Sequence, residues 1–485
     1  MMNRCNIVLF AISLLFSSSL IAGTIDVTKR GAKGDGVTDN TIIIQKAVDE
    51  CSKKGGGTVL IPSGSYLIRP IELKSNVNLH LDFGTLLLGS TRLSDNAFPF
   101  KDGSMNQSSG LLFARGQKNI SITGFGTIDG QGGSKTFQFG NDADGGPKRP
   151  KIIYFVECKG IVVTDVTLRN SAYWVQHYEK CEDVTIRGLK VFSHCNYNND
   201  GLDIDAKNAT ISDCYIDVED DAICFKSDHP EFCENITVTN CVTASNCNAI
   251  KFGTASHGGY RNIAVSNCVV RRAAEDNIRH WSKQLEHISA DVTVISGVAI
   301  EMVDGGIIDG ITVSNISMRD VQTPIFIRLG DRHRTYRKEG GGLKNINISN
   351  IVATAESLIA CSITGVETSY VENVSINNVQ ISYPGGGTSD MVSKPVPEMT
   401  KSYPENRMFG NTLPAAGFYV RHARNVRFNN VRFDAMKPDV RPLFFLDDVV
   451  GAELNQCKGA APADAKFIRT VHSSGIVADG KYLDK

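Results

Sequence analysis

The 485-residue chain carries a formal net charge of −1, and 41% of its residues are hydrophobic while 21% are charged. These values are typical of a globular protein with a large buried core. The balanced charge and the lack of a long polybasic run argue against a nucleic-acid partner. The length fits either two or three ordinary domains or one long single-domain architecture.

The N-terminus has the three parts of a secretory signal peptide. Arg4 gives the positive start, Ile7–Ile21 is apolar, and Ala22-Gly23 supplies small residues for cleavage. A membrane span needs roughly 20 apolar residues, and Ser13 and Ser17–Ser19 interrupt this stretch. We therefore expect residues 1–23 to be a signal peptide and residues 24–485 to form one domain. The protein is expected to be periplasmic or extracellular, without membrane insertion.

A single amphipathic helix is predicted near the start of the mature chain, at about Asp39–Lys53. Its apolar residues follow helical spacing and are Ile42, Ile43, Ala47, Val48 and Cys51. The sequence after it reads as short strands separated by Gly, Pro and Ser turns. One helix ahead of a long strand-rich region predicts a cap over the end of a stack of strands.

An internal repeat begins near residue 119, with the pattern N-[IV]-x-[IV] followed by polar residues and further apolar positions. Its leading asparagines at Asn208, Asn235 and Asn262 are 27 residues apart. A fixed period of this length in strand-forming sequence indicates an all-β β-solenoid, with each repeat forming one coil. Successive coils would stack about 4.8 Å apart.

The repeat also predicts where several cysteines lie. Cys214, Cys241 and Cys268 occupy positions that other repeats fill with isoleucine or valine, such as Ile316 and Val379. Residues that alternate with Ile and Val along the coils are expected to point into the core. The pairing of the other cysteines is left open, and the spacing offers no CxxC metal or redox motif.

A second repeated strand precedes several of the N-[IV] strands, and its side chains alternate between inward and outward faces. We align it at Asp200–Asp205, Asp221–Lys226, Asn248–Gly253, Asp276–Trp281, Ser296–Glu301 and Thr323–Arg328. The predicted outward residues form a strip with acids at one end and Lys, Arg and Trp further along, which resembles a substrate groove. They are Asp203, Cys224, Lys251, Arg279, Ala299 and Phe326, with Asp205, Lys226, Gly253, Trp281, Glu301 and Arg328 beside them.

Four segments break the repeat and are predicted to be loops that leave the coil. They are Leu93–Gln117, Gln131–Arg149, Arg328–Gly342 and Tyr383–Ala416. Loops of this size are uncommon in compact proteins unless they are functional or disordered. Walls of this kind would turn a groove into a pocket.

Of three candidate carboxylates, Asp200 precedes the adjacent pair Asp220 and Asp221 by 20 and 21 residues, which is one short coil. Glycoside hydrolysis needs a protonated carboxyl and a second carboxylate, held about 6.5–9.5 Å apart when the anomeric configuration is inverted. An offset of one coil plus a lateral displacement reaches that range. Crowding of three carboxylates also raises the pKa of one of them and supplies an acid. Aspartates are common in turns, but their combination on adjacent repeats favours catalysis.

With these motifs the mature chain resembles glycoside hydrolase family 28, the polygalacturonase family of right-handed parallel β-helices. The resemblance rests on GAKGDGVTDNT, GGGTVLIPSGSYL, NNDGLDID and VEDDAICFKSD. The family's Asn-Thr-Asp motif matches Asn198-Asn199-Asp200, and its Asp-Asp motif matches Asp220-Asp221. The resemblance implies that Asp220 is the general acid and that Asp200 and Asp221 position the attacking water of an inverting hydrolase.

Two other family motifs are not met. Where the family has Gly-His-Gly, this chain has Asn248-Ala249-Ile250. The family's Arg-Ile-Lys motif aligns either with Arg279-His280-Trp281 or with Ala299-Ile300-Glu301, and only the first keeps the arginine. We expect an altered substrate site, whose contacts are predicted to be Asn198, Asp203, Lys226, Lys251, Arg279, Trp281 and Arg328.

The sequence thus predicts an exported, monomeric, inverting hydrolase without cofactor or metal, cleaving galacturonate-containing linkages of a pectic oligo- or polysaccharide from the chain end. A rhamnogalacturonan hydrolase of the same family is a close alternative. Less favoured are a calcium-dependent β-helix of the pectate-lyase kind and a non-catalytic glycan-binding β-helix.

Overall fold

The structure is a computed structural model, and it describes residues 23–96, 110–138, 149–275, 294–332, 341–459 and 467–483. Residues 1–22, most of the predicted signal peptide, lie outside this range. Within the described ranges, no helix has the length and apolar character needed to cross a membrane. Helices are few and short: η1 (Thr28–Arg30), α1 (Thr41–Lys53), η2 (Leu93–Asn96), η3 (Lys135–Phe137) and α2 (Ser389–Val392).

Strands make up most of the described chain. Those of the first half are β1 (Gly23–Asp26), β2 (Asp35–Asp39), β3 (Gly57–Ile61), β4 (Gly64–Ile68), β5 (Ile71–Glu72), β6 (Val77–Leu81), β7 (Thr85–Gly89), β8 (Gly110–Arg115), β9 (Lys118–Gly124), β10 (Thr127–Asp129), β11 (Lys151–Val156), β12 (Lys159–Thr164), β13 (Thr167–Arg169), β14 (Gln176–Arg187), β15 (Lys190–Ser193), β16 (Leu202–Ser212), β17 (Tyr215–Val218), β18 (Ile223–Ser227), β19 (Cys233–Thr239) and β20 (Val242–Ser245). Those of the second half are β21 (Asn248–Ser256), β22 (Gly259–Arg272), β23 (Val294–Met302), β24 (Ile307–Leu329), β25 (Gly342–Ala355), β26 (Cys361–Thr364), β27 (Val371–Gly385), β28 (Phe418–Lys437), β29 (Phe444–Asn455), β30 (Lys458–Gly459), β31 (Ile468–Val471), β32 (Ser474–Ala478) and β33 (Lys481–Tyr482).

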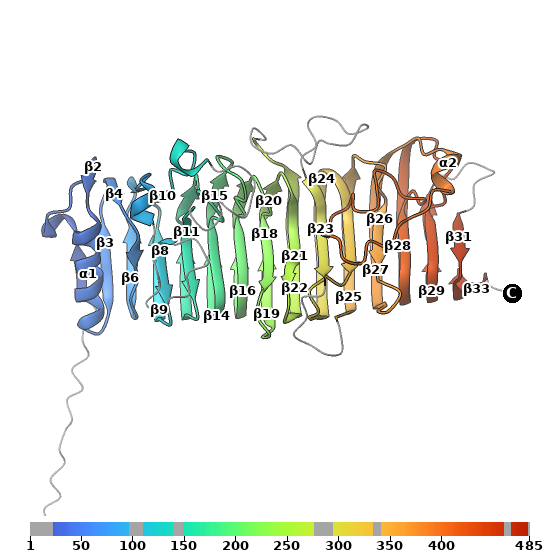
Figure 1. Cartoon of the computed structure of the whole chain (residues 1–485), viewed down its shortest axis with the longest axis horizontal. Coiled ribbons are helices and arrows are strands. Elements are labelled where there is room, and N and C mark those ends of the chain that lie inside the picture. Colours follow the sequence, from blue (N-terminus) through green and yellow to red (C-terminus); the bar gives the residue numbers. More distant parts are fainter. Residues whose placement is uncertain are drawn as a thin grey trace, which may run out of the picture.

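The strands stack as coils of a parallel β-helix. Most strands pair in parallel with strands of the preceding and following coils, so that Ala209, Ile236 and Ile263 lie in one register. Among the named strands of the described ranges, only the pair β32–β33 is antiparallel. Figure 1 shows the coils side by side along the long axis, from α1 at one end to β33 near the other. This confirms the predicted β-solenoid.

The core is one continuous column of buried apolar side chains inside the coils. Cys268 lies in register with Ile316, Ile351, Val379 and Val431 on successive coils. Cys214, Cys241 and Cys268 are buried in this column, as predicted from their exchange with isoleucine and valine. Every cysteine in the described ranges is a free thiol.

Asparagine ladders explain the leading asparagine of the repeat. Asn208, Asn235 and Asn262 all have a φ between 53° and 57°, in the left-handed region that asparagine tolerates better than most residues. The side-chain amide of each donates to the oxygen of the one before it, at 3.1 Å from Asn235 to Asn208 and 2.7 Å from Asn262 to Asn235. The residue type therefore serves both the turn and the contact between coils.

Helix α1 covers the N-terminal end of the stack, where it contacts β1, β3, β5 and β6. The cap was predicted, but one of its proposed apolar positions was wrong. The buried face is formed by Ile44, Ala47, Val48 and Cys51, whereas the Ile42 side chain is 59% exposed. The i, i+3, i+4, i+7 spacing from Ile44 places Ile42 on the solvent side.

Two sequence predictions about the coils need correction. The predicted loop Leu93–Gln117 contains β8, which pairs with β5 and β11 inside the stack. The predicted rung Asp276–Trp281 between β21 and β23 is wrong, because β21 pairs with β23 itself and brings Lys251 into register with Ala299. Arg279 and Trp281 lie outside the described residues.

Replacing one ladder asparagine tests how much the turns stabilise the coil. We expect Asn235→Ala to lower the free energy of unfolding by about 2 kcal/mol, because alanine is strained at this φ and both ladder contacts are lost. Asn235→Gly should cost less, since glycine keeps the backbone conformation. The measurement is urea denaturation followed by circular dichroism.

The matched control is Thr237→Ala, an exposed position on the same strand, which should change stability by no more than about 0.5 kcal/mol. Equal losses in Asn235→Ala and Thr237→Ala would contradict the role of the ladder.

Candidate active site

Asp200 and the pair Asp220-Asp221 lie in equivalent turns of adjacent coils, Asp200 between β15 and β16 and the pair between β17 and β18. Backbone hydrogen bonds join the two turns, from the Gly201 N–H to the Asp221 carbonyl at 2.8 Å and from the Leu202 N–H to the Ala222 carbonyl at 3.0 Å. A Cβ added at Gly201 would lie 2.6 Å from the Ala222 carbonyl oxygen. Glycine beside Asp200 thus permits the close approach of the two turns.

The three aspartates open into one cavity of about 270 Å³. Of the predicted site residues, Asn198, Asp200, Asp220, Asp221, Lys226 and Lys251 line it together. The remaining lining residues in the described ranges are Tyr173, Trp174, Asp228, Thr254, Ala255, Asp304, Arg332 and Tyr403. Asp203 and Arg328 are not among the described residues that line the cavity.

Lys226 compensates the acids on one side of the site. Its Nζ lies 3.4 Å from Asp200 Oδ2 and 3.2 Å from Asp203 Oδ1. Burial, together with the neighbouring Asp203 and Asp220, raises the pKa of Asp200 well above its usual range despite Lys226. Burial also raises the pKa of Asp203 to about 6, against the opposing effect of Lys226. The raised pKa expected from crowding therefore falls on Asp200.

Lys251 compensates the acids on the other side. Its Nζ lies 3.0 Å from Asp221 Oδ2 and 3.9 Å from Glu301 Oε2. Asp221 Oδ1 accepts a hydrogen bond of 2.8 Å from the Asn248 side-chain amide. Burial opposes ionisation of Asp221, but Lys251, Lys226 and Asn248 outweigh it and lower its pKa to about 2. Asp221 is thus a carboxylate at any ordinary pH, while burial raises the pKa of Glu301 to about 7.

Asp220 is held by donors of a different kind. Its Oδ1 accepts from the Asp221 backbone N–H at 3.0 Å, and its Oδ2 accepts from the Asn198 side-chain amide at 3.4 Å. The buried Arg149 donates to Asn198 Oδ1 at 3.0 Å, so the amide nitrogen of Asn198 must face Asp220. Asn198 is therefore an orienting partner of Asp220 as well as a lining residue.

Aromatic rings form a further wall of the cavity. Tyr173 and Trp174 stack with ring centroids 5.2 Å apart. The ammonium groups of Lys226 and the buried Lys151 lie 4.7 and 4.8 Å from the Trp174 ring centre. Such cation–π contacts fix the indole position. In sequence alone a single tryptophan such as Trp174 is as often a packing residue as a platform for a ligand, and the sequence gave no signal for Lys151.

Three lining residues reach the cavity from segments between strands. Asp304 forms a two-point ion pair with Arg332 at 2.7 and 2.8 Å. Tyr403, from the segment between β27 and β28, accepts a hydrogen bond of 3.1 Å from Lys251 Nζ. Sequence reasoning marked the segments of Arg332 and Tyr403 as loops, but it singled out none of these three residues. The repeat pattern does not predict the positions of side chains in segments outside the coils.

Two of the predicted substrate contacts have other surroundings in the structure. Asp203 is fully buried beneath the cavity as a counter-ion of Lys226. Arg328 is 1% exposed and donates to the carbonyls of Gly365, Glu398 and Met399 at 2.8 to 3.2 Å. The strand pattern correctly predicted that both side chains point away from the coil interior. Such a side chain can still be buried, because other side chains or loops can cover it.

The segments that the sequence aligned with the two unmatched family motifs include residues of the adjoining strands β21 and β23. Asn248 hydrogen-bonds Asp221, and the rung adjoining β21 is Ala299-Ile300-Glu301. Of the two alignments predicted for the family's Arg-Ile-Lys motif, Ala299-Ile300-Glu301 lies on that rung, whereas Arg279-His280-Trp281 lies outside the described residues.

Two groups of metal-ligating side chains occur in the described site, Asp200 with Asp203 and Cys224, and Asp220 with Asp221 and Cys247. In each group the candidate ligand atoms lie within 4.8 Å of one another. The ammonium groups of Lys226 and Lys251 already compensate Asp200, Asp203 and Asp221. Calcium takes six to eight oxygen ligands, whereas each of these groups offers two carboxyl groups and a thiol beside a lysine ammonium group, so the donor set fits calcium poorly.

The family described as Glycosyl hydrolases family 28 matches residues 51–401, which is most of the chain. The chain belongs to glycosyl hydrolase family 28. A probable polygalacturonase from Vitis vinifera is 32% identical over 219 residues, covering 42% of this chain and 44% of the relative. An exopolygalacturonase from Zea mays is 29% identical over 41% of this chain and 48% of the relative. The chain thus spans about half the length of the curated relatives it matches.

Solved structures agree on the fold of this family 28 chain. The crystal structure of a hyperthermoactive exopolygalacturonase from Thermotoga maritima matches with a TM-score of 0.59 at 23% identity, over 74% of this chain and 87% of that one. The similarity confirms the predicted right-handed parallel β-helix with its N-terminal helix.

Removing Lys251 tests the compensation of the buried acids. We expect Lys251→Met to lower the free energy of unfolding at pH 8 by about 3–5 kcal/mol, because Asp221 and Glu301 lose their buried counter-ion. Without Lys251, burial raises the pKa of Asp221 above that of the unfolded chain. The variant then regains stability relative to the wild type as the pH falls from 8 to 5 and the acids take up protons.

The measurement is urea denaturation of both proteins at pH 8 and pH 5. Lys207→Met is the matched control, because Lys207 is half-exposed and lies 3.6 Å from Glu234, so its loss should cost less than about 1 kcal/mol. A Lys251→Met deficit that stays constant between the two pH values would contradict the assignment.

Proposed function

We propose that this family 28 chain is an exported glycoside hydrolase that cleaves galacturonate-containing linkages in pectic polysaccharide, with inversion and from the chain end. The observation that carries the proposal is the convergence of Asp200, Asp220 and Asp221 on one polar cavity. The names of the similar proteins from Vitis vinifera, Zea mays and Thermotoga maritima support pectic substrates.

In the proposed reaction Asp220 donates its proton to the oxygen of the leaving group, while Asp200 and Asp221 position and activate the water. Asp221 suits the second role because Lys251 and Asn248 hold it ionised. Asp200, whose carboxyl has the raised pKa, lies on the adjacent turn and would orient the same water, while Asp221 takes its proton. In inverting glycosidases the general acid and the general base are held far enough apart to leave room for the attacking water, and in this proposal Asp220 is the acid on one side while Asp200 and Asp221 hold the water on the other.

Lysine compensation of the acids supports hydrolysis over calcium-dependent elimination. A pectate-lyase-like site needs a carboxylate cluster that attracts a divalent cation. Here Asp200 and Asp203 adjoin Lys226, and Asp221 adjoins Lys251. Binding of a cation at either acid group would place it beside a buried ammonium group.

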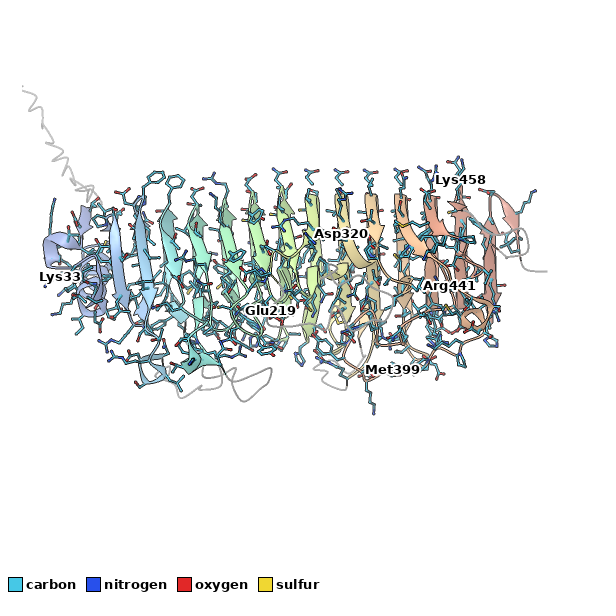
Figure 2. All side chains as sticks on the ribbon, turned by 90° about the horizontal axis from the view of Figure 1, so that it is seen from above. Lys33, Glu219, Asp320, Met399, Arg441 and Lys458 are labelled. Carbon is cyan, nitrogen blue, oxygen red and sulfur yellow. The ribbon has the colours of Figure 1, made fainter. Side chains whose placement is uncertain are left out.

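Chain-end action is supported by the segments around the cavity. Tyr403 comes from the segment between β27 and β28, and Arg332 follows β24. Both are additions to the coil, and together they give the groove a wall that an open groove for internal cleavage does not need. Figure 2 shows the irregular segments gathered along one long side of the molecule, the side of the labelled Glu219 and Met399.

Product analysis tests the proposed activity. Purified wild type is incubated with polygalacturonan, rhamnogalacturonan and their reduced oligosaccharides, with and without a chelator. We expect release of saturated monogalacturonate, first seen as the inverted anomer by NMR and unaffected by the chelator. Unsaturated products that require calcium would overturn hydrolysis, larger oligomers would overturn chain-end action, and preferential cleavage of rhamnogalacturonan would change the substrate.

A leaving-group comparison tests the assignment of the acid. Asp220→Asn should lower kcat on a galacturonate oligosaccharide by about 10²–10⁴-fold, yet retain much of the wild-type rate on a nitrophenyl glycoside, whose leaving group needs no proton. Asp200→Asn, the matched variant on the adjacent turn, should lose activity on both substrates. The reverse pattern would make Asp200, whose pKa is the raised one, the acid.

Export is tested at the N-terminus. Expression of the full chain in a bacterial host should yield a protein that starts at or near Thr24 in the periplasm or medium, as determined by N-terminal sequencing. An intact Met1 on a cell-associated protein would overturn the proposed division into residues 1–23 and 24–485.

A further inference from the structure

The segment between β27 and β28 is held by polar side chains of β24 and of the first part of β28. The Glu398 side chain receives two partners, Arg421 Nη1 at 2.9 Å on Oε1 and His422 Nε2 at 3.0 Å on Oε2. Arg328 donates to the backbone carbonyls of Glu398 and Met399 at 2.9 and 3.2 Å. We call these four residues, Glu398, Arg328, Arg421 and His422, the Glu398 clamp.

The clamp is built into the coil. Arg328 on β24 lies in register with Thr364, and Thr364 with Arg421, so the two guanidinium groups come from one outward ladder two coils apart. Asp447 pairs with Arg421 at 2.7 Å, and Asp448 contacts the second ring nitrogen of His422 at 2.7 Å. Arg421 and His422 are thus each held by a second carboxylate besides that of Glu398.

The clamped segment carries Tyr403 into the cavity. Two residues past Met399 the chain reaches the exposed Lys401, and Tyr403 then accepts the hydrogen bond from Lys251. Tyr403 as a whole is 55% exposed although it lines the cavity, where Lys251 Nζ lies 5.4 Å from its ring centre, so part of the side chain is open to a ligand. The Asp331 N–H also donates to the Thr400 carbonyl at 2.8 Å, which ties the segment to the end of β24.

We propose that Tyr403 is a specificity-determining residue that contacts a sugar ring of the substrate, and that the Glu398 clamp positions it. This inference rests on the proposed glycosidase function. The pyranose C–H face of a glycan packs on an aromatic face, while the ring hydroxyls need polar partners beside it, and Lys251 is already bound to the tyrosine hydroxyl. The hydrogen bond from Lys251 thus places the Tyr403 ring at the edge of the carboxylate cluster.

The first measurement is steady-state kinetics on a galacturonate oligosaccharide. Tyr403→Ala should raise KM about tenfold with kcat within about twofold, since an aromatic contact of this kind contributes about 1.4 kcal/mol. Tyr403→Phe keeps the ring and should keep KM within about threefold of the wild type. An unchanged KM in Tyr403→Ala would overturn the inference.

The clamp is tested by variants that act only through Tyr403. His422→Ala and the milder Glu398→Gln, which alters a half-exposed side chain of the segment itself, should each raise KM with little change in kcat. Neither should raise KM further in the Tyr403→Ala background. Additive effects on KM would overturn the positioning role. His472→Ala is the matched control, because His472 adjoins Asp447 but is 81% exposed and is not part of the clamp.

A second readout does not depend on activity. Trypsin should cut after Lys401 at least about fivefold faster in His422→Ala and Glu398→Gln than in wild type or His472→Ala, because local opening frees the segment for cleavage. Equal cleavage rates would overturn the clamp. If wild type hydrolyses no pectic substrate, the proposed function fails, and the proteolysis result still decides whether the clamp holds the segment.

Discussion

In-register stacking of parallel coils is the constraint on which the rest of this structure depends. Each residue lies over its counterpart about 4.8 Å away on the next coil, so a side chain must be compatible with the residues above and below it. Asparagine meets this condition because its amide both donates and accepts, and Asn208, Asn235 and Asn262 form a continuous ladder. Apolar residues meet it by packing, as in the column that joins Cys268 to Val431.

Charged residues can occupy such a stack only when their neighbours compensate them. The outward ladder places Glu301 in register with Arg328, and Arg421 with Asp447. Near the cavity the same requirement brings Lys226 to Asp200 and Asp203, and Lys251 to Asp221 and Glu301. The two ammonium groups therefore compensate part of the charge of the acid cluster and oppose the rise in carboxyl pKa that burial causes.

The electrostatic asymmetry of the three carboxyl groups follows from these contacts. Asp221 has both Lys251 and Asn248 and stays ionised, whereas Asp200 shares Lys226 with Asp203 and takes the raised pKa. Asp220 is oriented by Asn198, which Arg149 fixes in turn. Three like residues on adjacent turns thus acquire different properties from their surroundings, which is how one site performs acid and base chemistry at one pH.

Much of this molecule could be predicted from its sequence, because the same short pattern recurs along the chain. A pattern read over a few residues therefore also predicts how the coils stack. The period of the N-[IV] strands determined the stacked coil, the exchange of Cys268 with Ile and Val determined the core, and strand alternation determined the outward face of Lys251. The signatures around Asp200 and Asp220-Asp221 determined the candidate carboxylates and the family.

Only the tertiary structure decided what lies on top of the outward face. Alternation cannot distinguish Lys251, which lines the cavity, from Asp203 and Arg328, which are covered by other groups. It also placed a rung between β21 and β23, which pair directly with each other. Tyr403 and Glu398 come from a segment without repeat, and long-range contacts with Lys251, Arg421 and His422 fix their positions. Such contacts depend on residues distant in sequence, which no local pattern encodes.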